Sequence, residues 1–299
     1  MSQNVLVELS DALADAAEKA GRATVLVNAR RRMPASGVLY AADLVLTADH
    51  VLEREEDIKI TLADGTEVGA RVAGRDAGLD LAVLRLERSA DTVAGVTEAP
   101  ARLGQLALVL GRPSPDGIEA SLGTVSAIGG PIRTGRGGML ERYIRTDSIS
   151  YPGFSGGPLV AADGTVLGIN TSGLARGAAI TVPADIAWNI AGTLVSHGRI
   201  KRGYLGIRSQ PVEIAANLQK ALKREQPTGL LIVGVENDSP ASRGGLMVGD
   251  ILVAVAGEPV SHHDELFARL KGDMTGQSTG TEILRGGQLQ TVNVVVGER

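Results

Sequence analysis

The strongest local signal of chemistry in this chain is a serine set among glycines. Ser155 lies in the segment Gly-Phe-Ser-Gly-Gly at residues 153–157. Glycines on both sides of a serine allow a tight turn that exposes the hydroxyl and aims backbone N–H groups at one point. The segment therefore predicts a nucleophilic serine beside an oxyanion hole, although a glycine-rich turn with an incidental serine would have the same local sequence.

A serine hydroxyl is a weak nucleophile until a base takes its proton, and a carboxylate has to orient that base. The best candidate base is His50, which follows the apolar run at residues 44–47, where the end of a strand could hold the ring rigidly. The best candidate carboxylate is Asp80, which opens the apolar run at residues 81–86 and would need a partner if it were buried. Taken alone, a histidine more often has a structural or surface role, so the wider pattern has to decide.

The segment at residues 153–157 also matches the G-x-S-x-G pattern of α/β-hydrolases, which would make the protein an esterase or a lipase. In those enzymes the serine opens a helix, and the acid and the histidine lie downstream of it. Here a proline and an Asp-Gly turn follow the serine and indicate a hairpin, and the chain order is histidine, aspartate, serine. This order favours a chymotrypsin-like arrangement.

The composition is that of a folded protein without cysteine. The chain has 299 residues, 43% hydrophobic and 21% charged, and this length favours two domains. The net charge is −4 and neither sign is massed in a long run, which argues against a nucleic-acid partner. The absence of cysteine excludes a disulfide framework, a thiol nucleophile and thiolate metal sites.

The first residues of the sequence bear on location. They lack a basic stretch before the apolar positions, and acidic residues interrupt those positions, so neither a signal peptide nor a membrane span is predicted. On this basis we expect a cytoplasmic protein. A periplasmic or other extracytoplasmic location is the alternative, if a signal was removed before this numbering began.

Short apolar runs separated by turn signals dominate the chain up to Pro183, and such regular short strands favour barrels or sandwiches. Helical periodicity predicts a leading helix over residues 7–20 and a second helix over residues 184–196, and a short basic connector then places a domain boundary near residue 200. The rest predicts a small α+β module, with strands at 205–207, 229–235, 251–255 and 292–296 and helices at 240–245 and 262–271.

Several short motifs together resemble the successive motifs of the HtrA (Deg) family of trypsin-like serine proteases. Their order and spacing agree with the family, and the resemblance extends from about residue 22 to residue 297. The motifs are Thr47-Ala-Asp-His-Val51, Asp80-Leu-Ala-Val-Leu84, Thr146-Asp147, Gly153-Phe-Ser-Gly-Gly-Pro-Leu159 and Leu167-Gly-Ile-Asn-Thr171.

The resemblance implies a mainly β fold, in which a chymotrypsin-like pair of six-stranded β-barrels precedes an α+β PDZ domain. The expected parts are an N-terminal helical segment at residues 1–21, a protease domain of two barrels and a closing helix at 22–198, and a PDZ domain at 203–297. The first barrel would supply His50 and Asp80, and the second would supply Ser155. No metal or organic cofactor is needed for this chemistry.

The resemblance also implies an oxyanion hole in the loop of Gly153, Phe154 and Ser155, with the N–H groups of Gly153 and Ser155 as donors. Phe154 departs from the family, which usually has Asn there, and this substitution raises the question of whether the loop is in an active state. Ile149 and Ile180 are expected to line the specificity pocket, with no acid at its floor. They predict a cut after a small or medium aliphatic residue.

The C-terminal module resembles the PDZ domains that follow the protease in HtrA proteins, through Arg202-Gly-Tyr-Leu-Gly-Ile207 and the segment at residues 239–253. The resemblance implies that Tyr204, Leu205, Gly206 and Ile207 form the peptide-binding site. Their backbone would hold a peptide's terminal carboxylate while the peptide adds as a strand. The structural alternative is that Gly206 only turns the chain.

The function that follows is a serine endopeptidase acting on unfolded or damaged proteins, with a PDZ domain that recruits substrate or regulates activity. The alternative, motivated by Phe154, is a chaperone-like peptide-binding protein whose protease site is dormant. A homotrimer is a further expectation from the family, with no support from aromatic residues near the start of the chain.

Overall fold

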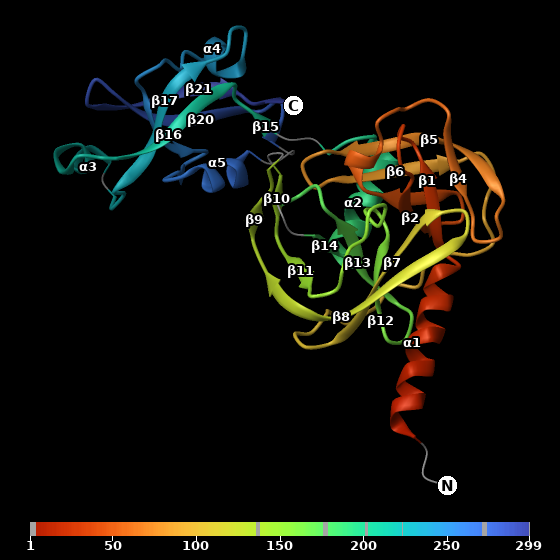
Figure 1. Ribbon diagram of the computed structural model, residues 1–299. Helices are drawn as coiled ribbons and strands as arrows, with labels where there is room; N and C mark the ends of the chain where they lie inside the picture. The colour runs from red at the N-terminus through yellow and green to blue at the C-terminus, as the bar shows by residue number, and fades with distance from the viewer. Residues whose placement is uncertain are drawn as a thin grey trace. The chain divides into compact units, whose positions relative to one another are not determined.

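The structure is a computed structural model that describes residues 4–135, 138–175, 179–200, 203–222, 224–270 and 274–298 (Figure 1). Contacts divide the chain into two compact units, residues 1–200 and residues 201–299. The first unit contains two closed six-stranded barrels, and the second contains a sheet with short helices. The prediction of a mainly β fold with a double barrel and an α+β module is confirmed.

The first barrel closes in the strand order β1-β2-β3-β6-β5-β4. Its interior is filled by alternate residues of each strand, because successive side chains of a strand point to opposite faces. On β6, Ala82 and Leu84 point into this barrel, while Leu81 and Val83 belong to a separate cluster outside it. The strands are β1 (Thr24–Asn28), β2 (Ala35–Ala41), β3 (Leu44–Thr47), β4 (Ile58–Thr61), β5 (Glu67–Asp76) and β6 (Leu81–Leu86), and the one-turn helix η1 (Asp49–Val51) follows β3.

The second barrel closes in the order β11-β14-β13-β12-β7-β8. Its core contains Val109, Ile144, Leu159 and Leu167, and the ring of Phe154 lies among them. A two-stranded ribbon of β9 (Ile132–Arg133) and β10 (Met139–Leu140) accompanies it. The barrel strands are β7 (Leu106–Ser114), β8 (Gly117–Gly129), β11 (Tyr143–Thr146), β12 (Pro158–Ala161), β13 (Val166–Thr171) and β14 (Ile180–Pro183).

The two barrels share an apolar cluster that the helix α2 (Ala184–His197) covers. Leu81 and Val83 from the first barrel meet Ile169 and Val182 from the second barrel in this cluster, and Leu194 of α2 packs on them. The helix ends at Gly198, whose φ of 75° is left-handed and therefore suits glycine. The cluster fixes the two barrels against each other and so fixes the groups that they supply to a shared site.

The leading helix α1 (Val5–Gly21) begins with Asn4, whose side chain accepts a hydrogen bond from the N–H of Leu6. Only its C-terminal half packs on the barrels, where Ala16 and Ala20 contact apolar residues of β7 and β12. The N-terminal half extends away from the barrels (Figure 1) and leaves Val5 and Leu6 more than 70% exposed. This part of the helix therefore adds little to the core.

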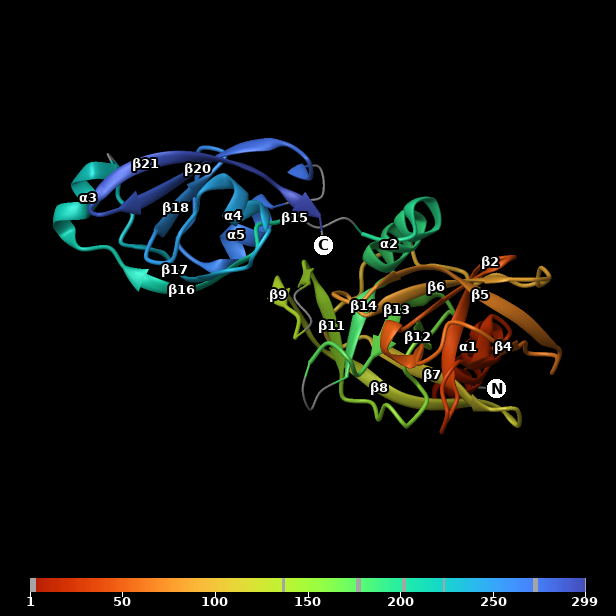
Figure 2. The ribbon, with the colours of Figure 1, turned by 90° about the horizontal axis from the view of Figure 1, so that it is seen from above.

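The second unit is built on a sheet in the order β16-β17-β18-β20-β21, in which β16 is an edge strand (Figure 2). Leu230, Leu252 and Ile283 fill its core together with Leu266 from α5. The helix α3 and the strand β20 have no counterpart in the sequence prediction. The elements are β15 (Gly203–Tyr204), β16 (Ile207–Glu213), α3 (Ala216–Leu222), β17 (Thr228–Val235), α4 (Pro240–Gly244), β18 (Ile251–Val255), β19 (Glu258–Pro259), α5 (His263–Arg269), β20 (Ser278–Arg285), β21 (Gln288–Val295) and β22 (Gly297–Glu298).

Two residues named in the predictions, Arg202 of the motif that opens this module and Lys271 at the end of its last predicted helix, lie outside the described residues.

Candidate active site

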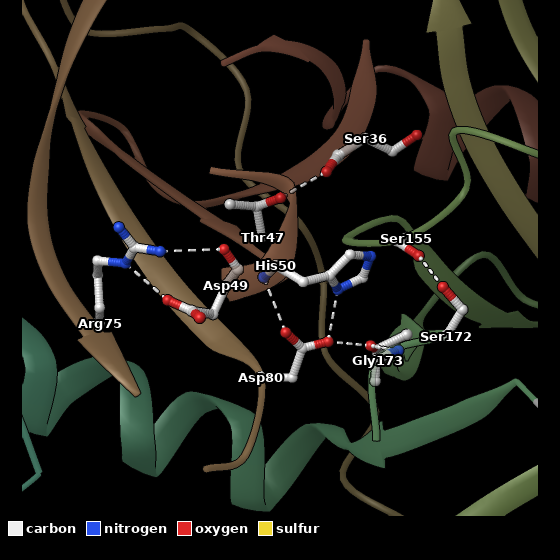
Figure 3. Close-up of polar contacts among 10 residues, drawn as sticks. Ser36, Thr47, Asp49, His50, Arg75, Asp80, Ser155, Ser172 and Gly173 are labelled. Carbon is white, nitrogen blue, oxygen red and sulfur yellow. Dashed lines mark hydrogen bonds and ion pairs between the residues drawn. The ribbon is translucent and has the colours of Figure 1, made fainter. Parts of the chain in front are cut away.

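His50 and Asp80 form a tightly bonded pair in the first barrel. Asp80 Oδ2 lies 2.7 Å from His50 Nδ1, and Asp80 Oδ1 accepts the backbone N–H of His50 at 2.8 Å (Figure 3). The Asp80 side chain is completely buried, whereas that of His50 is 18% exposed. Because the carboxylate occupies Nδ1, the exposed nitrogen Nε2 is the one that can take a proton from another group.

Three donors compensate the burial of Asp80. Burial raises the pKa of a carboxyl group, but hydrogen bonding and attraction from His50, together with the hydroxyl of Thr171, outweigh it and hold the pKa of Asp80 below its usual value. Asp80 is thus ionised at neutral pH. Its φ of 54° is left-handed, a conformation that aspartate tolerates better than most residues, and its carbonyl accepts the N–H of Asp49.

The turn that carries His50 is braced from its other side. Asp49 is buried and accepts a hydrogen bond from Arg75 Nε at 2.6 Å (Figure 3). The same guanidinium also donates to Glu55 at 2.8 Å. A charged hydrogen bond to a buried carboxylate restrains the one-turn helix η1. The turn that carries His50 is therefore held by two buried carboxylates, Asp49 bound to Arg75 and Asp80 bound to His50.

The second barrel brings Ser155 to the same cavity as His50. This cavity has a volume of about 600 Å³, and its lining includes His50, Gly153, Ser155 and Ser172. The hydroxyl of Ser155 lies 3.1 Å from that of Ser172, and among the described residues it makes no hydrogen bond to His50. A free site of this kind often tightens only when substrate binds.

The first barrel holds the loop that carries Ser155. The hydroxyl of Ser36 donates to the Gly153 carbonyl at 2.7 Å, and the N–H of Ser36 donates to the Ser155 carbonyl at 3.2 Å. The same hydroxyl accepts the N–H of Arg112, a residue of β7. One buried serine therefore ties this loop and a strand of the second barrel to β2 of the first barrel.

The backbone N–H groups of the loop divide into occupied and available ones. The N–H of Phe154 donates to the Tyr151 carbonyl at 3.1 Å, so it is not free to bind an oxyanion. The N–H groups of Gly153 and Ser155 have no acceptor within the described part of the chain. Gly153 has a φ of 91°, which a residue with a Cβ would rarely adopt. The loop thus has two donors that could stabilise a negative oxygen.

Phe154 is a core residue rather than a surface residue of this loop. Its side chain is fully buried in the second barrel and meets the ring of Tyr151 edge-on, with 5.4 Å between ring centroids. The ring fits because Gly111 faces it, since a Cβ at residue 111 would lie 2.5 Å from the ring. Phe154 therefore anchors the loop from below and leaves its exposed surface free.

The two isoleucines expected in the specificity pocket lie elsewhere. Ile180 is buried in the cluster between the barrels, and Ile149 is 59% exposed, so neither lines the cavity beside Ser155. A neighbouring residue replaces each of them, because Ser150 and Ala179 line the cavity. A shift of one residue along an extended segment turns the side chain to the opposite face.

The sequence prediction also missed several residues that support the site. Thr171 stood at the end of a recognised motif, but its hydroxyl had no assigned partner. Ser36 and Asp49 carried no spacing signal, because their partners are far away along the chain. For a metal, the described residues contain no group of three or more side chains of the kinds that bind one.

In the second unit, the predicted peptide-binding residues lie around the start of the edge strand β16. Gly206 has a φ of 81° and packs against Ser239, where a Cβ would not fit. The N–H groups of Leu205 and Gly206 find no acceptor among the described residues, while the Leu205 side chain is in the core. Ile207 begins β16, and Tyr204 pairs with β22 and donates through its hydroxyl to Glu236.

Two closed barrels with a histidine and an aspartate on the first and a serine on the second define the chymotrypsin-like class of serine proteases. In agreement, the family model of the trypsin-like peptidase domain matches residues 35–169, and that of the PDZ domain matches residues 203–296.

Similar proteins extend this match over most of the chain. A Halomonas elongata protein named "Probable periplasmic serine endoprotease DegP-like" is 35% identical over 280 residues, which cover 90% of this chain and 57% of that protein. A Rhizobium meliloti protein of the same name is 31% identical over 276 residues, which cover 90% of this chain and 54% of that protein. The solved serine endoprotease from Yersinia pestis is 28% identical, with a TM-score of 0.79 over 96% of this chain and 98% of its own.

The HtrA-type protease AlgW, solved with a decapeptide, is 28% identical, with a TM-score of 0.78 and coverage of 96% and 98%. The chain is therefore homologous to the DegP/HtrA serine endoproteases and carries a trypsin-like peptidase domain followed by a PDZ domain. It spans a little more than half the length of the curated relatives that it matches.

The expectation of a cytoplasmic location is wrong. The curated relatives are named periplasmic, which points to the periplasm instead. The expectation rested on the first residues, but a targeting segment is not part of the folded domains, so the residues that make the fold carry no information about it. Within the described residues, no helix has the length and apolar character needed to cross a membrane.

Thr171→Val tests the ionised state of Asp80. Because its folded-state pKa lies below the unfolded value, the carboxylate stabilises the fold above the unfolded pKa, and this contribution is lost as pH falls through the folded pKa. Removing the Thr171 hydroxyl raises the folded pKa, so the variant should lose stability at a higher pH than the wild type. At neutral pH we expect a loss of about 1–3 kcal/mol.

Thermal unfolding from about pH 3 to pH 7 measures this shift, followed by the fluorescence of Trp188, the chain's single tryptophan. Thr193→Val is the matched control, because that hydroxyl donates only to a carbonyl of its own helix. Parallel pH curves for wild type and Thr171→Val would contradict the interpretation.

Phe154→Asn, which introduces the residue usual in the family, should destabilise the protease domain by about 3–5 kcal/mol, because it removes a buried ring and places an amide in an apolar core. Urea unfolding followed by Trp188 fluorescence measures the loss. Phe154→Leu is the control and should be clearly more stable than Phe154→Asn, since it keeps an apolar side chain. Unchanged stability of Phe154→Asn would show that the ring is not an anchor.

Proposed function

We propose that the protein is a serine endopeptidase in which Ser155 is the nucleophile, His50 the general base and Asp80 the carboxylate that orients it. The observation that carries the proposal is the buried, ionised Asp80 bonded to His50 Nδ1, with Nε2 left for the cavity that Ser155 lines. The proteins similar to this chain are named serine endoproteases, which supports the same activity.

In the proposed reaction Ser155 Oγ attacks the peptide carbonyl while His50 Nε2 takes the hydroxyl proton. The imidazolium is stabilised by Asp80 and returns the proton to the leaving amine, and water then cleaves the acyl-enzyme by the same steps. The N–H groups of Gly153 and Ser155 bind the negative oxygen of each tetrahedral intermediate. For this attack the Ser155 hydroxyl has to exchange its Ser172 partner for His50.

The proposed substrates are unfolded or damaged proteins, cut after a small or medium aliphatic residue. The cavity walls contributed by the second barrel are small or uncharged, among them Ser150, Ala175 and Ala179. Among the described lining residues of that side there is no Asp or Glu that would attract a basic side chain. Ile149 and Ile180 have no part in this version of the pocket.

The proposed role of the PDZ domain is to bind the C-terminus of a peptide and so to recruit substrate or regulate cleavage. The N–H groups of Leu205 and Gly206 are available for a carboxylate, and β16 is an edge to which a peptide can add as a strand. The AlgW structure that contains a decapeptide supports peptide binding in this family.

We assign these roles to a protease domain at residues 22–198 and a PDZ domain at 203–297, with a helical segment before them. The homotrimer implied by the resemblance stays a prediction. Light scattering of the full chain decides it, and a monomer mass would exclude it.

The endopeptidase activity is tested with casein as an unfolded substrate. Wild type should cleave it, and Ser155→Ala should lower the rate by at least about a thousandfold, because the covalent step is lost. Ser172→Ala is the control that keeps the nucleophile and should remain active. If wild type and Ser155→Ala released fragments at the same rate, the activity would lie elsewhere; if wild type were inactive but bound casein, the dormant, chaperone-like alternative would be supported.

The PDZ assignment is tested with a fluorescent peptide that has either a free or an amidated C-terminus, using Ser155→Ala to prevent cleavage. Amidation removes the charge that the N–H groups of Leu205 and Gly206 would bind, so affinity should fall about ten- to a hundredfold. Fluorescence anisotropy gives both dissociation constants. Equal affinities would mean that the terminal carboxylate is not recognised.

A further inference from the structure

The cavity at Ser155 has two walls of different character. The second barrel contributes uncharged residues, including Tyr151 and Ala175. The first barrel contributes His50, Met33 and the charged side chains of Arg30, Arg32 and Glu53, and these three are the only Asp, Glu, Lys or Arg residues in the described lining. Within the described lining, the charged side chains therefore lie on the side of His50.

The arginines of this wall come from the loop between β1 and β2, which contains Arg30, Arg31 and Arg32 in succession, whereas Glu53 follows η1. A second cavity of about 460 Å³ is lined by Arg30, Arg31, Glu53 and Arg54. Together the two cavities have four arginines, Arg32 included, and one carboxylate, that of Glu53, in their lining. No ion pair involves any of the four within the described part of the chain, and the single carboxylate can offset at most one of their positive charges.

The four arginines differ in the hydrogen bonds that their side chains make. The guanidinium of Arg30 donates to the carbonyls of Met33 and Pro34, so it holds the loop in its folded form. Arg54 is similarly occupied by the carbonyl and the side chain of Asn28. Arg32 is exposed, lines the Ser155 cavity and has no hydrogen-bond partner among the described residues. It is therefore free to bind an anion.

The chemistry of the reaction says which part of a substrate meets this wall. His50 has to return its proton to the leaving amine, so the amine and the residues that follow the cut bond lie on the His50 side. The uncharged wall of the second barrel is left for the residues that precede the bond. A side chain just after the bond would then approach Arg32.

We propose that Arg32, on a loop held by Arg30, is a specificity-determining residue that selects substrates with an aspartate or glutamate shortly after the scissile bond. This inference rests on the proposed endopeptidase activity and adds a substrate preference to it. A single ion pair at an exposed site is worth up to about 1 kcal/mol, so the preference for glutamate over glutamine should be about two- to fivefold in kcat/KM.

The test uses internally quenched peptides that differ only in having Glu or Gln at the first, second or third position after the cut bond. Wild type should prefer Glu at one or more of these positions, and the preference should disappear at about 0.5 M salt, which screens exposed charges. Arg32→Gln should abolish the preference, and Arg32→Glu should reverse it. Arg102→Gln, an exposed arginine outside the cavity, is the matched control and should behave as wild type.

Equal kcat/KM for Glu and Gln peptides with wild type would overturn the inference while leaving the proposed activity intact. So would a preference that survives in Arg32→Gln. If wild type cleaves none of the peptides, the proposed activity fails, and the affinities of Ser155→Ala for the Glu and Gln peptides, measured by anisotropy, decide the inference separately. Tighter binding of a Glu peptide that is lost in the Arg32→Gln, Ser155→Ala double variant would support it, and equal binding would reject it.

Discussion

The buried charge of Asp80 is the constraint on which the first unit of this protein depends. A carboxylate without exposure is tolerable only if donors surround it, and the donors come from both barrels, His50 from the turn after β3 and Thr171 from the end of β13. Each barrel therefore has to be closed and in register before the Asp80 carboxylate has all of its hydrogen-bond donors. The shared apolar cluster under α2 supplies the rigidity that keeps these donors in place.

Ser36 extends the same logic to the nucleophile. Its hydroxyl and its N–H donate hydrogen bonds to two carbonyls of the Ser155 loop, and its hydroxyl oxygen accepts a hydrogen bond from the backbone N–H of Arg112. The loop is thus positioned from the first barrel by hydrogen bonds and from the second barrel by the buried ring of Phe154. This division leaves the N–H groups of Gly153 and Ser155 pointing to no internal partner, which is what a site that binds a transient negative charge requires.

The sequence was sufficient for the parts of the site that have local signatures. Periodicity predicts the short strands and the closing helix, and the resemblance carried by the ordered motifs implies the double barrel and the approach of His50 to Asp80. The sequence was insufficient where a single-residue shift decides the outcome: Ile180 lies in the core while Ala179 lines the cavity, and no pattern in that segment distinguishes the two. Ser36, Asp49 and Thr171 bind partners that only the fold brings near.

The sequence also could not show that the Phe154 side chain is buried. Phe154 raised the question of whether the loop is in an active state, because the sequence does not show that Gly111 leaves room for the ring in the core beneath the loop. Location was mispredicted for a different reason, since it is not a property of the folded domains.

The wall that the second barrel presents to His50 and Asp80 is bare backbone at Gly173, whose N–H donates to the Thr171 hydroxyl. A Cβ there would lie 2.8 Å from His50 Nδ1 and still nearer to the Asp80 carboxylate. Any residue other than glycine at position 173 is therefore excluded while His50 and Asp80 remain paired in this geometry. Substitution there becomes possible only after the pairing is lost. In a descendant of this chain, a side chain at residue 173 would indicate that the histidine and the aspartate are no longer paired in this way, even if histidine, aspartate and serine were all still present.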